Sequence, residues 1–274
     1  MDFTLKIYRE LLVTLQNKGY RFLRYEDYCI EERSLLVDGK SRLWVILRHD
    51  VDELPSNALK MAKIENGLGI KATYYFRTVK HSNNPEVIRT IARLGHEIGY
   101  HYEDLALAKG NVELAQQSFK ENLEYFRSFY PVKTVCMHGS STSEYDNRLL
   151  WGDCSFGDFD LLGEPYLTTD FEKIFYLTDT GYAWDGGKYA VRDIVENKFE
   201  LKFHSTRDII NTVQKGDFPD RIFILAHTLW TDRFWLWVSL HVREFVRNRI
   251  KNIARKNIIV KRFYSFLVNL YWKS

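Results

Sequence analysis

The sequence predicts an α/β protein with a mainly parallel sheet of about seven strands. Short β-rich segments alternate with segments whose apolar residues recur at helical spacing, which is the pattern of βαβ units. One segment, 43–47, is apolar without a break, as expected for a strand that is buried on both faces. Seven strands can form an open sheet or a barrel, and this alternation is compatible with both.

The composition is that of a globular protein. The 274 residues are 45% hydrophobic and 15% aromatic, and the formal net charge is +3. We expect a single domain over 1–274, with an N-terminal helix at 3–18, a barrel or sheet at about 43–230 and a helical tail at 231–274. Three scattered cysteines exclude a disulfide framework. No secretory leader and no run near the ~20 apolar residues of a spanning helix are visible, so the cytoplasm is the expected location.

Helices are expected wherever a periodic apolar pattern has a start or stop signal. Residues 3–18 end at a Lys-Gly pair, and Pro55 and Pro85 each occupy the first-turn position that proline favours. The expected helices are 3–18, from Pro55 to Gly67, from Pro85 to Gly95, 112–129, a short one near 147–151, one that starts at Ser205 or Thr206, and one or more in the tail. The stretch 25–40 reads as a linker that ends in an Asp-Gly turn.

Seven β-rich segments complete the pattern. The expected strands are 43–52, 71–77, 97–101, 132–138, 174–179, 200–204 and 221–227. Because aspartate is a poor strand residue, Asp50 and Asp52 should occur where the first of these strands ends.

Polar residues that can bind metals or transfer protons occur at the ends of six of these strands. They are Asp50 and Asp52, His101, His138, Asp179, His204 and His227. In a barrel the carboxyl ends of the strands converge on one mouth, which is where active sites form. Taken singly, each residue has a structural alternative as a capped or hydrogen-bonded side chain. Four other histidines lie off this pattern, and we assign them no chemistry: His49, His81, His96 and His241.

The paired carboxylates are the most informative of these residues. A nearby carboxylate raises the proton affinity of its neighbour, and a divalent cation reverses that effect. Asp50 and Asp52 therefore suggest one base and one metal ligand. The structural alternative is a helix N-cap followed by a solvated turn.

The C-terminal tail is basic and aromatic. Between 241 and 274, Glu244 is the sole acid among nine lysines and arginines. One interpretation is an amphipathic helix that makes peripheral contact with an anionic membrane through 241–274, at its inner face. The other is a closing helix with one core face and one solvated basic face. Nucleic acid is not expected as a partner, because no motif accompanies a pI of only 8.6.

Three segments resemble the polysaccharide deacetylase (NodB-homology) family. They are Arg-His-Asp-Val-Asp at 48–52, Gly-His-Glu-Ile-Gly-Tyr-His at 95–101, and Ile-Leu-Ala-His at 224–227 followed by a tryptophan. The segment at 48–52 is similar to the branch of this family whose first motif is His-Asp-Val-Asp. The resemblance covers about 43–230. It implies a distorted (β/α) barrel of about seven strands, a divalent metal that is usually zinc, and removal of N- or O-acetyl groups from a glycan.

The resemblance also implies roles for single residues. Asp50 matches the catalytic base, Asp52 the metal-binding carboxylate, and His101 the first histidine of the His-x-x-x-His motif. The second histidine of that motif is replaced by Leu105, which cannot bind a metal. Glu103, Asp104 and His138 are candidate replacements, and we favour His138 because imidazole suits zinc, with Glu103 next.

These roles define an expected mechanism on a carbohydrate substrate. Asp50 would take a proton from water beside the cation held by Asp52, His101 and His138. His227 would protonate the leaving group, and Asp179 would orient His227. Further candidate contacts to the substrate are a backbone N–H near Tyr75, the rings of Trp184 and Trp230, and the side chains of Glu103 and His204. Core packing is the alternative for both tryptophans.

Three other functions remain open at this point. The first is a metal-independent hydrolase of C–N bonds, with His101, His138 and His227 limited to proton transfer. The second is a sugar-binding protein without catalysis. The third is a scaffold at a membrane surface that acts through the basic tail. The sequence indicates neither the particular substrate nor the oligomeric state.

Overall fold

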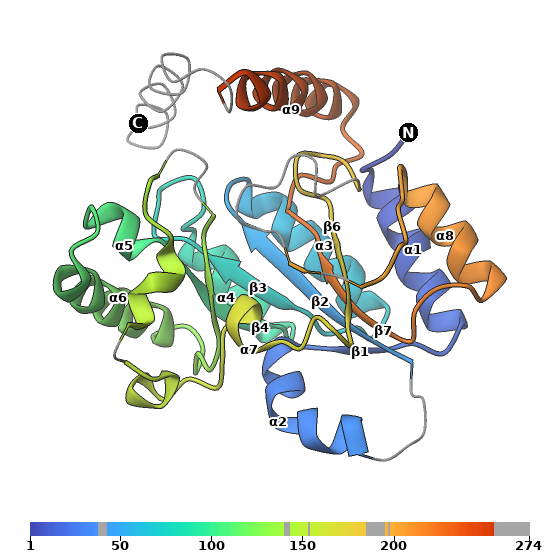
Figure 1. Cartoon of the computed structure of the whole chain (residues 1–274). Coiled ribbons are helices and arrows are strands. Elements are labelled where there is room, and N and C mark those ends of the chain that lie inside the picture. Colours follow the sequence, from blue (N-terminus) through green and yellow to red (C-terminus); the bar gives the residue numbers. More distant parts are fainter. Residues whose placement is uncertain (38–42, 140–142, 153, 185–194, 197, 255–274) are drawn as a thin grey trace.

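Seven parallel strands form one curved sheet in the computed structural model, which describes residues 1–37, 43–139, 143–152, 154–184, 195–196 and 198–254 (Figure 1). The strands are β1 (Arg21–Leu23), β2 (Trp44–Val51), β3 (Thr73–Phe76), β4 (Glu97–Tyr102), β5 (Val135–Met137), β6 (Phe175–Thr178) and β7 (Arg221–Leu225). Their order is β5-β4-β3-β2-β7-β6, and β1 pairs in parallel with the first half of β2.

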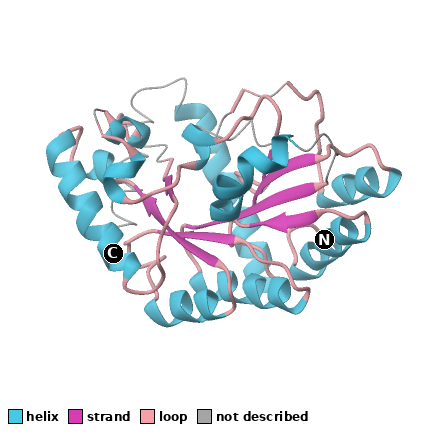
Figure 2. Ribbon diagram, turned by 90° about the horizontal axis from the view of Figure 1, so that it is seen from below, coloured by secondary structure: helices cyan, strands magenta, loops and turns pink. Residues whose placement is uncertain are grey.

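The sheet curls into a half-barrel (Figure 2). Among the described residues β5 and β6 form its two edges and do not pair with each other. The expected distorted (β/α) barrel of about seven parallel strands is confirmed in this open form.

Helices precede, separate and follow the strands along the chain. They are α1 (Leu5–Asn17), α2 (Tyr25–Val37), α3 (Pro55–Gly67), α4 (Pro85–Arg93), α5 (Asp104–Leu107), α6 (Val112–Arg127), α7 (Pro165–Thr168), α8 (Thr206–Lys215) and α9 (Phe234–Ala254), with short 3₁₀ turns η1 (Asn147–Trp151) and η2 (Phe156–Phe159). Side-chain oxygens of Thr4, Asn84, Asn111 and Ser205 accept hydrogen bonds from the first turns of α1, α4, α6 and α8. Such caps satisfy backbone donors that have no partner within the helix.

Two expected elements are wrong. The stretch read as a linker contains helix α2, whose Tyr25 and Tyr28 are both buried and whose first turn carries two acids that favour the positive end of the helix dipole. Residues 38–40 of that stretch lie outside the described residues. No strand forms at 200–204, because the backbone N–H of His204 donates to Asp208 in the cap of α8 rather than to a neighbouring strand.

The tail begins as a helix. α9 confirms the expected helix as far as Ala254, and the part of the tail from 255 to 274 lies outside the described residues. No helix in the described part of the chain is both long and apolar enough to cross a bilayer.

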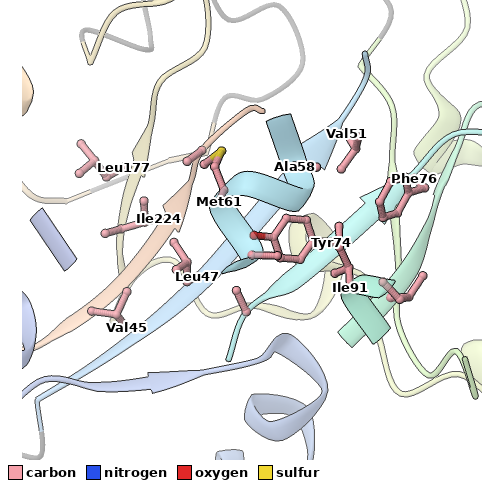
Figure 3. Packing of buried hydrophobic residues seen from close by; sticks show 14 of the residues in the cluster. Val45, Leu47, Val51, Ala58, Met61, Tyr74, Phe76, Ile91, Leu177 and Ile224 are labelled. Atoms are coloured by element: carbon pink, nitrogen blue, oxygen red, sulfur yellow. The ribbon is translucent and has the colours of Figure 1, made fainter. Parts of the chain in front are cut away.

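The two faces of the sheet pack against different parts of the protein. Apolar side chains on the outer face pack under α3 and α4, among them Leu47, Tyr74 and Ile224 (Figure 3). The alternate residues point to the concave face, where Trp44 and Ile46 of β2 pack with Phe223 of β7. Because successive strand residues point to opposite faces, the residues that continue this inner row along each strand also point inward.

Candidate active site

The inner rows of three strands end in acidic and imidazole side chains. On β2 the row that begins with Trp44 and Ile46 reaches Arg48, Asp50 and then Asp52. The corresponding rows of β4 and β5 end in His101 and, one residue past the strand, His138. Since the strands are parallel, these ends meet at one mouth of the half-barrel.

Three of these side chains converge around one oxygen atom. Asp52 Oδ1 lies 3.6 Å from His101 Nε2 and 3.6 Å from His138 Nε2. This oxygen is buried and accepts no hydrogen bond within the described part of the chain. Burial opposes ionisation of Asp52, but His138, His101 and Arg77 outweigh it and lower the pKa of this carboxyl well below its usual range.

Both imidazole rings are held by their other nitrogen. His101 Nδ1 lies 2.9 Å from the carbonyl oxygen of Cys136, and His138 Nδ1 lies 3.0 Å from Glu103 Oε2. A carbonyl or carboxylate oxygen can only accept, so both Nδ1 atoms carry the proton. Each Nε2 therefore faces Asp52 and presents a lone pair there whenever its ring is neutral.

The donor atoms of Asp52, His101 and His138 are of the types that suit a zinc ion, and two of their three separations are consistent with one. Two imidazole nitrogens and one carboxylate oxygen are ligands that zinc accepts, and three protein ligands are the number found in catalytic zinc sites. At Zn–ligand distances of about 2.0–2.2 Å, tetrahedral ligand atoms lie roughly 3.4 Å apart, close to the two 3.6 Å separations observed. The Glu103–His138 contact is the carboxylate–histidine pairing that commonly orients zinc ligands.

A second donor set overlaps the first at His101. One ligand atom each from Asp50, His101 and Cys136 lies within 4.8 Å of the others, so these buried residues could also hold a metal. However, both Asp50 oxygens already accept hydrogen bonds from Arg48. A cation there would also face the Arg48 charge at close range. For these reasons we favour the set centred on Asp52, whose side chain is 27% exposed and so reachable from solvent.

Arg48 is a site residue that the sequence analysis missed. Its Nε and Nη2 donate to the two oxygens of Asp50 at 2.8 and 2.5 Å, and both side chains are buried. Burial raises the pKa of the Asp50 carboxyl, but Arg48 and His101 outweigh burial and the pKa is lowered. Asp50 Oδ2 also lies 3.5 Å from His101 Nε2, which places this carboxylate beside the Asp52 cluster.

Arg77 is the second missed residue. It follows β3, the strand that appeared to lack a polar end, and belongs to the same inner row as Thr73 and Tyr75. Its Nε and Nη2 donate to Glu103 at 3.0 and 2.6 Å, and Nη1 lies 4.0 Å from Asp52 Oδ1. Although burial opposes ionisation of Glu103, His138 and Arg77 lower its pKa to about 2. Glu103 is thus an anion that holds His138.

A third group of contacts lies at the ends of β6 and β7. His227 Nδ1 lies 2.7 Å from Asp179 Oδ1, and the other oxygen of Asp179 accepts from the indole N–H of Trp230 at 2.9 Å. Burial lowers the pKa of His227, but Asp179 and, more weakly, Asp52 and Asp50 raise it to about 10. His227 is therefore an imidazolium at neutral pH in the metal-free protein, and it interacts with the carboxylates of the cluster.

The remaining candidate residues lie away from the open mouth. Trp184 and Trp230 are buried, pack with Phe3, and offer no ring face to a sugar in this structure, so core packing describes them better. His204 is exposed beside the start of α8. The side chain of Tyr75 is fully buried below His101.

Tyr75 owes its position to the glycine beside it. Gly99 is its neighbour on β4, and a Cβ atom at this glycine would lie 2.3 Å from the Tyr75 ring. Because Gly99 has no Cβ atom, the Tyr75 ring can lie across β4. Its hydroxyl lies 2.7 Å from Oγ1 of Thr134, the residue just before β5.

The fold and site together define a parallel α/β half-barrel with a candidate metal-binding and acid–base centre at its carboxyl-end mouth. No family model and no curated protein matches the sequence. Solved structures similar to this chain include a CE4 family pseudoenzyme from Bacillus anthracis, BA3943, at 13% identity and a TM-score of 0.42 over 74% of this chain and 60% of that one. The chain thus spans less than two thirds of that protein.

Two further similar structures are a protein described as a carbohydrate esterase and a domain described as CE4. PdaA of Bacillus subtilis, a family 4 carbohydrate esterase, is 11% identical over 87% of this chain and 84% of its own, with a TM-score of 0.40. The Xyl-CE4 domain of a multidomain xylanase from the hindgut metagenome of Trinervitermes trinervoides is 14% identical over 76% and 84%, with a TM-score of 0.39. Similarity at this level establishes neither the family nor the activity of this chain, which must be argued from its own residues.

Proposed function

We propose that this protein is a metal-dependent hydrolase that removes acetyl groups from a carbohydrate. The observation that carries the proposal is the convergence of two oriented imidazole nitrogens on the buried, unbonded Oδ1 of Asp52. The resemblance of 48–52 and 95–101 to polysaccharide deacetylase motifs supports the choice of an acetylated sugar.

In this proposal Asp52, His101 and His138 hold the metal. A zinc ion there would supply Lewis-acid polarisation of the acyl carbonyl and would acidify water. Glu103 keeps the Nδ1 proton of His138 in place, so that the opposite nitrogen stays available as a ligand. Arg77 in turn fixes Glu103.

Asp50 is the proposed general base. It lies next to His101 but is held by Arg48 rather than offered to the metal. Its lowered pKa keeps it ionised at neutral pH and ready to accept a proton from water. The two hydrogen bonds from Arg48 also prevent the Asp50 carboxylate from turning toward the cation, so that the general base and the metal ligand remain different residues.

His227 is the proposed general acid. Asp179 holds it through Nδ1, and its raised pKa keeps a proton on Nε2 at neutral pH. A cationic imidazole can donate that proton to the amine or alcohol that leaves when the acyl bond breaks. The base thus comes from β2 and the acid from the end of the neighbouring strand β7, so both lie at the same mouth.

Metal content of matched variants tests the ligand set. We expect the purified protein to bind one zinc ion, and Asp52→Asn and His138→Gln to weaken zinc affinity by roughly 100-fold or more. Cys136→Ser is the matched control and should bind zinc like the parent. If Cys136→Ser loses zinc and His138→Gln keeps it, the overlapping set with Asp50 is the metal site instead.

Acetate release from a panel of N- and O-acetylated amino sugars tests the reaction. A chelator should abolish release and added zinc should restore it. Release that continues unchanged after zinc removal would support the metal-independent alternative. Zinc binding without release of acetate from any acetylated sugar would contradict the deacetylase proposal.

A further inference from the structure

The outward face of α9 is apolar. Trp235, Val242, Phe245, Val246 and Ile253 are each between 48% and 80% exposed, and we call these five residues the outer α9 face. Their spacing of three, four or seven residues places them on one side of a helix with 3.6 residues per turn. Such an apolar stripe on an exposed helix marks a contact surface rather than scattered surface residues.

The opposite face of α9 binds the rest of the protein through polar groups. The guanidinium of Arg243 donates to both oxygens of Glu53, and Asn248 Nδ2 donates to the carbonyl of Gly181 at 2.7 Å. The buried carboxylate of Glu244 accepts from Arg247. Leu240 is also buried on this inner side, so α9 carries apolar side chains on both sides, whereas a surface helix normally keeps them on the inward side alone.

These contacts also locate α9 relative to the candidate active site. Glu53 directly follows Asp52, and Gly181 lies two residues beyond Asp179. α9 therefore lies across the carboxyl ends of the strands, at the same end of the half-barrel as the site, with its outer face directed away from the sheet (Figure 1).

We propose that the outer α9 face binds the surface of an anionic lipid bilayer. Beyond Glu244 the sequence has no acid up to its last residue, whereas basic residues occur at 247, 249, 251, 255, 256, 261, 262 and 273. Exposed apolar side chains together with a tryptophan and lysines or arginines are the composition of helices that lie in the interface of anionic membranes.

Arg249 argues against a second copy of the chain as the occupant. It lies seven residues beyond Val242, in the middle of the apolar stripe, and is exposed. Two such faces packed against each other would bring like charges together in an apolar contact, which is unfavourable. Anionic headgroups would instead pair with this guanidinium while the apolar side chains enter the interface.

This placement has a consequence for the substrate, which rests on the proposed function. With α9 on the membrane, the mouth that holds Asp52 and His138 lies near the lipid headgroups. The acetylated sugar would then be the headgroup of a membrane-anchored glycolipid rather than a free oligosaccharide. Its sugar could reach the mouth from the bilayer surface without leaving the lipid.

Vesicle co-sedimentation of the full chain tests the membrane contact. The triple variant Trp235→Ser, Phe245→Ser and Val246→Ser should bind vesicles of phosphatidylcholine and phosphatidylglycerol about tenfold or more weakly than the parent. The matched control, Ile30→Ser, Leu107→Ser and Leu149→Ser, removes three side chains that are 62–70% exposed elsewhere and should bind like the parent. Arg249→Glu keeps the apolar side chains and should weaken binding to anionic vesicles selectively, with no comparable loss on phosphatidylcholine alone.

Three outcomes would overturn the membrane contact. In the first, the triple variant and the parent bind vesicles equally. In the second, light scattering shows a dimer that the triple variant converts to monomers, so that a second copy covers the face. In the third, the triple variant melts several degrees lower than the control with unchanged vesicle binding, so that another part of this chain covers it.

The substrate class is tested separately, because vesicle binding needs neither zinc nor substrate. The triple variant should lose activity on an acetylated amino sugar linked to a lipid in vesicles and keep it on the same soluble sugar. Equal activity of parent and variant on the vesicle substrate would refute the glycolipid inference and leave the deacetylase proposal intact. Absence of activity on both substrates in the parent would contradict both the deacetylase proposal and the glycolipid inference, while the membrane contact would still be decided by co-sedimentation.

Discussion

The guanidinium of Arg48 and the carboxylate of Asp50 face each other from the same strand, two residues apart, joined by two hydrogen bonds of 2.8 and 2.5 Å. The period of two along β2 directs both side chains to the concave face. Arg48 is fully buried, so its charge is neutralised by Asp50 and little screened by solvent. The pair fixes both the position and the ionisation of the proposed base.

Replacement of Arg48 should impair catalysis more than binding. In Arg48→Met the buried carboxylate of Asp50 loses both hydrogen bonds from the guanidinium. We therefore expect kcat to fall by about 10²–10⁴, with little change in KM. Without the cation, burial should dominate and raise the pKa of Asp50, so the acidic limb of the activity profile should move to higher pH. Steady-state rates from pH 4 to 9 check both effects. An unchanged acidic limb would show that Arg48 does not set this pKa.

Asp50 and Asp52 should respond differently to the same change. Asp50→Asn should abolish measurable acetate release while zinc content stays at the parent level, because the proposed base is not a ligand. Asp52→Asn should lose activity and zinc together. Elemental analysis alongside activity separates the two roles, and loss of zinc from Asp50→Asn would contradict our assignment.

Glu103 should act on the metal through His138. Glu103→Gln removes the anion that holds the Nδ1 proton, and we expect zinc affinity to fall by about 10–100-fold, measured by competition with a chromophoric chelator. The neighbouring Asp104 offers a matched control, since it bonds to Tyr100, Ser118 and Asn122 instead. Asp104→Asn should keep the parental zinc affinity even if it lowers stability.

The His227–Asp179 pair should make stability depend on pH at the alkaline side. The pKa of His227 is raised from 6.5 to about 10 in the folded protein, so folding favours the protonated form. The stabilisation is therefore complete below about pH 6.5 and is lost as the pH rises through about 10.

Urea unfolding of the metal-free protein between pH 6 and 10.5 measures this effect. We expect the free energy of unfolding of the parent to fall by about 4 kcal/mol over that range beyond any fall in His227→Gln. Parallel curves for the two proteins would contradict the pKa assigned to His227.

The sequence predicts much of the fold because several strands carry strong local signals. The first half of β2, Trp44 to Leu47, is apolar without interruption, and β3, β4 and β7 are rich in β-branched and aromatic residues. Helix α2 escapes prediction because its apolar residues show little helical periodicity. The β propensity of 200–204 predicts a strand, but the backbone of this segment leads into the capping box of α8.

The site is less predictable where charged residues are buried. Arginine is rarely buried unless paired, so Arg48 and Arg77 read as surface positions when each is considered alone. Counting two residues back from Asp50 and two forward from Tyr75 would have placed both on the inner face. The sequence predicts that His138 and Asp52 face one mouth but not how closely they approach, because the two lie on strands separated in the sheet by β3 and β4.

The phenol ring of Tyr75 on β3 crosses Gly99 on β4 and reaches Thr134, the residue that precedes β5. A methyl group at 99 would force this ring aside, and a small residue at 75 would leave a void beneath the histidine above it. A substitution at either position therefore calls for a matching change at the other, and a chain without the Tyr-Gly combination would need a different floor beneath the candidate active site.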